Sequence, residues 1–164
     1  MDISEKLATY LAKSSKSVSE SRNYLKKKGF NEKDIEEIIE EFKDIGYLDD
    51  KNYSYEFFLY AKKKRWADRR IFLELYKRGI SDEDAQDGYF EFLDLEADKF
   101  PSDAECCKII AEGMIANGRH FFCGEEIEKL KNRIGRRLSS YGYSTDLIID
   151  TIEYVDAKLH EEEE

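Results

Sequence analysis

Apolar residues recur at intervals of three and four along almost the whole chain, and the alternation typical of strands is scarce. This spacing places apolar side chains on one face of a helix, so it predicts an all-α fold. The segment from Ser17 has the Ser17 and Glu20 spacing of a capping box, and it ends at Gly29 after three lysines. Asn31 then starts a second helix, which ends at Gly46. The apolar stripe of this second helix consists of Ile35, Ile38, Ile39 and Phe42.

The same helix, turn and helix occur three times. In each copy a leucine precedes the turn glycine by four residues: Leu25 and Gly29, Leu75 and Gly79, and Leu138 and Gly142. The second copy continues with a cap at Ser81 and a stripe of Ala85, Tyr89 and Phe92, and the third with Ile148, Ile152 and Val155. Internal repeats of this length indicate stacked units, none of which can bury its apolar face alone.

One more helix is expected before each pair, over about Ile3–Lys13, Asn52–Arg65 and Ala104–Ala116. The sequence therefore predicts nine helices in three tandem three-helix repeats, over residues 1–50, 51–98 and 99–160. Stacking of such repeats gives an elongated, curved helical array. Residues 161–164 are four glutamates, which we expect to form a solvated acidic tail.

Composition narrows the class of protein further. No segment approaches the roughly 18 apolar residues of a membrane span, and the N-terminal segment lacks the apolar core of a signal peptide. The three cysteines are not spaced as a zinc or redox motif, so we expect reduced thiols and a cytoplasmic protein. No glycine-rich phosphate loop is present, and we expect no cofactor, no metal and a monomer.

Positive charge is concentrated locally in a chain whose formal net charge is −10. Six of the nine residues from Lys62 to Arg70 are basic. The candidate partner- or DNA-binding residues are Lys62, Lys63, Lys64, Arg65, Arg69, Arg70, Lys77 and Arg78 in the second repeat, and Lys131, Arg133, Arg136 and Arg137 in the third. Any contact of this run with DNA would be to phosphate and independent of base sequence. The alternatives left open are an acidic protein surface, or ordinary solvated helix faces with lysines at helix ends.

The stretch GYLDDKNYSYEFF at 46–58 resembles the signature of the RecX family, and RRIFLELYKRGIS at 69–81 is similar to a second family pattern. The signature residues are Gly46, Tyr47, Leu48, Asp49 and Asp50, with the turn glycines Gly29, Gly79 and Gly142. The resemblance implies a non-enzymatic regulator that binds the filament of the recombinase RecA on DNA. It also implies that the protein modulates, mainly inhibits, RecA in DNA repair, recombination and the SOS response.

The signature also has a physical interpretation. Gly46 ends a helix, Tyr47 and Leu48 pack the turn, and Asp49 or Asp50 caps the next helix. We therefore interpret the acidic pair as structural rather than as a catalytic or metal site. Trp66, inside the basic run, is interpreted as core rather than as a base-stacking residue.

The sequence does not favour a metal site or a catalytic nucleophile. The candidate residues His120, Cys123, Cys106 and Cys107 are too few and too scattered for either, and we interpret the thiols as semi-buried. The alternative to a RecA regulator is a helical-repeat adaptor that binds another protein without nucleic acid.

Overall fold

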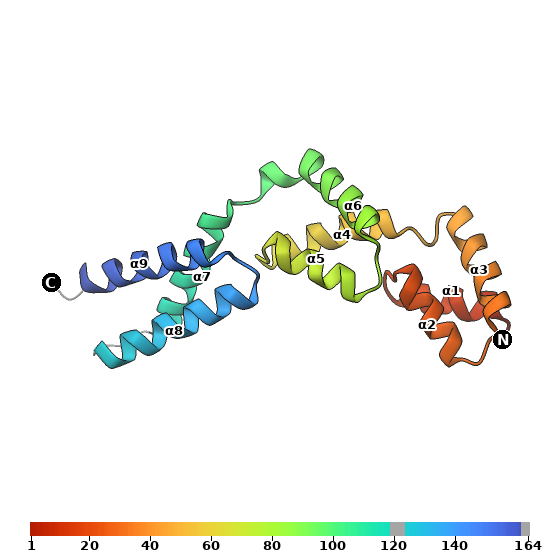
Figure 1. The fold of residues 1–164 in the computed structure, drawn as a ribbon, viewed down its shortest axis with the longest axis horizontal. Coiled ribbons are helices and arrows are strands. Elements are labelled where there is room, and N and C mark those ends of the chain that lie inside the picture. The colour runs from red at the N-terminus through yellow and green to blue at the C-terminus, as the bar shows by residue number, and fades with distance from the viewer. Residues whose placement is uncertain (119–123, 162–164) are drawn as a thin grey trace. The chain divides into compact units, whose positions relative to one another are not determined.

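The computed structural model describes residues 1–118 and 124–161, which form helices joined by short turns (Figure 1). The elements are α1 (Ile3–Lys13), α2 (Val18–Lys27), α3 (Glu32–Asp44), α4 (Asp50–Lys63), α5 (Asp68–Lys77), α6 (Asp82–Leu95), the 3-10 turn η1 (Ala97–Lys99), α7 (Asp103–Asn117), α8 (Gly124–Ser140) and α9 (Thr145–Glu161). The described ranges contain no strand, and the predicted all-α fold is confirmed.

The local signals in the sequence place most helix ends correctly. Asn31 and Ser81 cap α3 and α6 through hydrogen bonds from backbone N–H groups to their side chains, as predicted. The helix expected over 52–65 begins earlier, at Asp50. It also ends earlier, because the backbone turns left-handed at Arg65, with φ 64°. That turn has no glycine in it, so the sequence pattern gave no sign of where the helix ends.

The chain divides into two compact units. Unit 1 comprises Met1–Tyr60 and Ile71–Ala97, and unit 2 comprises Ala61–Arg70 and Asp98–Glu164. Helices α4 and α5 each contribute residues to both units. The predicted repeats at 1–50, 51–98 and 99–160 therefore remain a prediction, while the two units are the compact bodies of the structure.

Unit 1 contains a cluster of buried side chains and an aromatic group around one buried ring. The first lies among α1, α2 and α3, and its members are Leu7, Val18, Leu25, Ile35, Ile38, Ile39, Phe42 and Leu48. The second is aromatic and centred on Phe58 of α4, whose ring contacts Phe72, Tyr89 and Phe92 at centroid distances of 5.1 to 5.9 Å. Since the residues predicted to form the stripes of α3 and α6 supply these groups, tertiary packing uses the faces that the periodicity indicated.

Unit 2 has one larger core between α7, α8 and α9. It contains Ala67, Cys106, Cys107, Ala111, Ile127, Leu130, Ile134, Leu138, Tyr143, Val155 and Leu159. Ala67, from the loop between α4 and α5, is far from the others in sequence. The end of α4 and the start of α5 are therefore held by the last three helices.

Candidate partner-binding surface

The signature stretch forms the turn between α3 and α4. Gly46 ends α3 with φ 84°, and Leu48 is buried. Tyr47 is 71% exposed, and its ring makes an edge contact with Phe42. The prediction that Tyr47 and Leu48 pack the turn is thus confirmed for Leu48, whereas most of the Tyr47 ring is exposed to solvent. In a segment leaving a helix, successive side chains point to opposite sides, and only one of the two can face the core.

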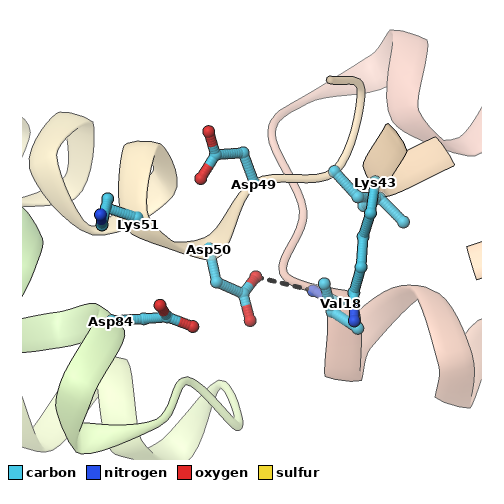
Figure 2. A pocket seen from close by; sticks show the side chains of 7 residues that line it. Val18, Lys43, Asp49, Asp50, Lys51 and Asp84 are labelled. Carbon is cyan, nitrogen blue, oxygen red and sulfur yellow. Dashed lines mark hydrogen bonds between the residues drawn. The ribbon is translucent and has the colours of Figure 1, made fainter. Parts of the chain in front are cut away.

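The two aspartates of the signature have different partners. Asp49 accepts a hydrogen bond from the N–H of Asn52 at 3.1 Å, which confirms the predicted cap of α4. Asp50 points the other way and accepts the N–H of Val18, the first residue of α2, at 2.9 Å (Figure 2). Burial raises the pKa of Asp50, and the Asp84 carboxylate facing the same hollow raises it further, against the lowering effect of the Val18 N–H. The signature therefore joins α4 to α2 as well as ending α3.

A second contact in unit 1 attaches the turn between α5 and α6 to the start of α2. The Ser17 hydroxyl donates to the carbonyl of Arg78 at 2.7 Å. The next residue, Gly79, has φ 77° and lies directly against Ser19. A Cβ at Gly79 would come within 2.3 Å of the Ser19 hydroxyl oxygen. Glycine is therefore needed here for its backbone angle and for its size.

The capping box predicted at Ser17 is only half formed. The Ser17 hydroxyl accepts the N–H of Glu20 at 3.0 Å, as expected. Within the described chain, the return bond from the Ser17 N–H to the Glu20 carboxylate is not made. That carboxylate lies 3.9 Å from the guanidinium of Arg78 instead. The correction has a tertiary cause, because Arg78 comes from another helix pair and competes for Glu20.

Unit 2 contains a contact of the same kind. The Ala67 N–H donates to the carbonyl of Tyr141 at 2.8 Å. The next residue, Gly142, has φ 92°, and a Cβ there would lie 2.8 Å from the backbone nitrogen of Arg70. The turn between α8 and α9 is therefore packed on the start of α5 in the same way as the turn between α5 and α6 is packed on the start of α2, although slightly less tightly.

The two contacts use equivalent residues. Ser17 and Ala67 immediately precede α2 and α5, while Arg78 and Tyr141 immediately precede a turn glycine. The first turn glycine, Gly29, differs from the other two, because a Cβ there would have no neighbour within 4 Å. We call these two contacts the joints. They are consistent with the predicted repeats, each joint being internal to one compact unit.

Four of the twelve basic residues predicted to bind a partner are half-buried and make internal contacts. Lys62 forms an ion pair with Asp68. The Arg70 guanidinium lies 3.7 Å from the centroid of the Trp66 ring and donates to the Ser140 carbonyl at 3.2 Å. Trp66 is half-buried with the Arg70 guanidinium over its ring, and it belongs to neither cluster of buried residues, so it is not the core residue that was predicted.

The other two half-buried basic residues also serve the fold. Arg78 pairs with Glu74 at 3.2 Å. Lys131 contacts Glu128 at 2.7 Å and Asp156 at 3.0 Å, and the hydrogen bond to Glu128 is the main cause of its raised pKa. The remaining eight predicted residues are exposed: Lys63, Lys64, Arg65, Arg69, Lys77, Arg133, Arg136 and Arg137. Of the twelve predicted residues, these eight are accessible to a partner.

Cys106 and Cys107 are buried, and burial raises the pKa of both thiols, that of Cys107 to about 11. Such thiols stay protonated at neutral pH and are poor nucleophiles. His120, Cys123 and the tail residues Glu162, Glu163 and Glu164 lie outside the described residues. Within those residues, no group of three or more histidine, cysteine and acidic side chains is arranged to hold a metal ion.

Sequence reasoning missed two exposed apolar residues on α5. Leu73 is 51% exposed and Tyr76 is 72% exposed. The helical period alone marks both as outward-facing once Leu75 is taken as buried, so the signal was present in the sequence.

Curated proteins similar to this chain are named regulatory protein RecX. Two come from Clostridium botulinum, strains Eklund 17B / Type B and Alaska E43 / Type E3, and are 28% identical over 147 and 137 residues, or 89% and 84% of this chain. A third, from Caldanaerobacter subterraneus, is 42% identical over 60 residues, which are 36% of this chain and 30% of that protein. The resemblance to RecX is confirmed. No family model matches the chain.

Solved structures of RecX have the same fold as this chain. The crystal structure of RecX from Lactobacillus salivarius superposes with a TM-score of 0.70 at 24% identity, over 94% of this chain and 95% of that one. A second crystal structure of regulatory protein RecX also gives 0.70, at 17% identity, over 92% and 71% of the two chains. The comparison therefore shows that the described helices have the fold seen in these RecX structures.

The chain spans 65% and 60% of the length of the two Clostridium botulinum RecX proteins. Among the described helices of this RecX-like chain, none is both long enough and apolar enough to cross a membrane.

Proposed function

We propose that this chain is a non-enzymatic regulator of the RecX kind that binds the RecA filament on DNA and limits recombinase activity. The observation that carries the proposal is its likeness to RecX proteins over most of its length, in sequence and in fold. The eight exposed basic residues support it, because a filament that contains DNA presents phosphates to a cationic surface.

The test is co-sedimentation of the purified protein with RecA filaments on single-stranded DNA, with DNA alone as a parallel arm, at low and physiological salt. We expect binding to the filament and a fall in RecA's DNA-dependent ATP hydrolysis. Unchanged ATP hydrolysis and no co-sedimentation at stoichiometric excess would refute the proposal.

The contribution of the cations is tested by reversing charges that the fold does not use. Lys63→Glu with Arg69→Glu changes two exposed residues and spares the ion pair of Lys62 and the stacked Arg70. We expect filament affinity to fall at least tenfold with an unchanged circular dichroism spectrum. Lys13→Glu with Lys33→Glu is the matched control, since it makes the same change in net charge at exposed positions outside the basic run. Equal affinities of the two variants would remove the basic run from the proposal.

The second candidate function is a helical adaptor for another protein. The formal net charge of −10 favours it, because a strongly acidic chain is repelled by bare DNA. A stable protein partner other than RecA, bound independently of salt, would support this alternative.

A further inference from the structure

The outward face of α5 differs from the same face of the equivalent helices α2 and α8. The three helices are aligned by the buried leucine four residues before the turn glycine, and Leu25, Leu75 and Leu138 are each fully buried. Counted from that leucine, the exposed positions two residues before it and one after it are Asn23 and Lys26 in α2, and Arg136 and Ser139 in α8. In α5 they are Leu73 and Tyr76. Only the middle helix carries apolar side chains there.

The fold itself gives no reason for this difference. Leu73 and Tyr76 expose 51% and 72% of their surface, whereas Ile71 and Leu75, on the opposite face, are fully buried. The two equivalent helices keep the same buried leucine and the same turn with polar residues at these positions. Exposed apolar side chains that a fold does not require mark a binding surface when they lie together.

The residues around Leu73 indicate what kind of surface this is. Arg69 and Lys77 lie four residues before and after Leu73, so the three side chains follow one another on one stripe of the helix. Both basic side chains are exposed. Arg69 has no ion-pair partner among the described residues, and Lys77 makes a loose contact with Glu74 at 3.5 Å. An apolar centre flanked by positive charge is complementary to an apolar surface flanked by negative charge.

We propose that the outward face of α5 docks on a protein surface that offers an apolar patch bordered by acidic side chains. Tyr76 is able to stack on a base, and Arg69 and Lys77 to bind phosphate, but the exposed Leu73 at the centre of the face gains from contact with an apolar protein surface and not from either of these. We therefore assign this face to protein rather than to DNA. Arginine and tyrosine are the residues that most often dominate protein interfaces, and leucine completes the apolar centre. The inference rests on the proposed function and adds that α5 contacts the recombinase subunits of the filament and not their DNA.

The test replaces the apolar residues by those that the equivalent helices already tolerate. Leu73→Asn introduces the residue of α2, and Tyr76→Ser that of α8. The matched control is Phe90→Ser with Leu93→Asn, which removes apolar side chains of similar exposure from α6. Binding to RecA filaments and to bare single-stranded DNA is measured for all three proteins, together with thermal unfolding.

We expect the α5 variant to bind the filament at least tenfold more weakly, at an unchanged unfolding temperature, while the α6 control changes binding less than twofold. Equal binding by wild type and the α5 variant would overturn this inference and leave the proposed function intact. A parallel loss of affinity for bare DNA would overturn it too, because it would place DNA on this face. Failure of the wild-type protein to bind the filament would overturn both proposals.

Discussion

Alanine substitutions at the three equivalent turn glycines separate the cost of a left-handed backbone from the cost of packing at the joints. Gly29, Gly79 and Gly142 all have positive φ, at 92°, 77° and 92°. At each of the three positions, alanine in this left-handed conformation lowers the free energy of unfolding by about 1–2 kcal/mol. At Gly29 this is the whole expected loss, because a Cβ there meets nothing within 4 Å.

The other two glycines add a collision to this strain. A Cβ at Gly79 would lie 2.4 Å from the Cβ of Ser19, and one at Gly142 would lie 2.8 Å from the backbone nitrogen of Arg70. Forcing one extra methyl group into a tight contact costs about 1–3 kcal/mol. We therefore expect Gly79→Ala and Gly142→Ala to lower the free energy of unfolding by about 2–5 kcal/mol, summing these two contributions.

Urea unfolding followed by circular dichroism measures all three losses. Fluorescence of Trp66, the only tryptophan, reports separately on the joint that contains Gly142. Ser19→Gly provides a rescue at the other joint, since after removal of its side chain the nearest Ser19 atom is 3.9 Å from the new methyl group. In a double-mutant cycle with Gly79→Ala, the two changes should be favourably coupled by about 0.5–3 kcal/mol. Equal losses of stability at the three glycines, with no coupling between Gly79→Ala and Ser19→Gly, would refute the close packing that we assign to the joints.

Two further predictions concern single residues. Arg65→Gly should raise the free energy of unfolding by about 1 kcal/mol in urea titrations, because Arg65 has φ 64° and glycine adopts this left-handed conformation without strain. The substitution keeps the carbonyl that accepts the hydrogen bond from the Tyr143 hydroxyl. A loss of stability would contradict this prediction. Asp50→Asn keeps an acceptor for the Val18 N–H but cannot ionise. The pKa of Asp50 in the folded protein is raised above 3.8, so the wild-type protein loses stability as pH rises through the folded pKa. In thermal unfolding, the variant should therefore gain stability relative to wild type as pH rises from the ordinary aspartate value of 3.8 through the raised folded pKa. A stability difference that does not change with pH would rule out the buried carboxylate as its cause.

The sequence shows where the candidate site lies, but it does not show which of the site's basic residues are accessible to a partner. The twelve basic residues are visible in the sequence, but the four that the fold uses, such as Arg70, cannot be told from the exposed ones, such as Arg69. The distinction depends on what each side chain meets: Arg70 covers Trp66 and bonds to Ser140, 70 residues away. No local pattern records a contact of that separation.

The sequence by itself determined the helices, their apolar faces and the turn glycines. These features follow from interactions between residues a few positions apart, such as caps, helical periodicity and the left-handed preference of glycine. The tertiary structure decided how the helix pairs are joined, through bonds such as that from Ser17 to Arg78 across 61 positions. It also decided that Arg65 is left-handed, because contacts with distant residues, including Tyr143, outweigh the local preference of an arginine.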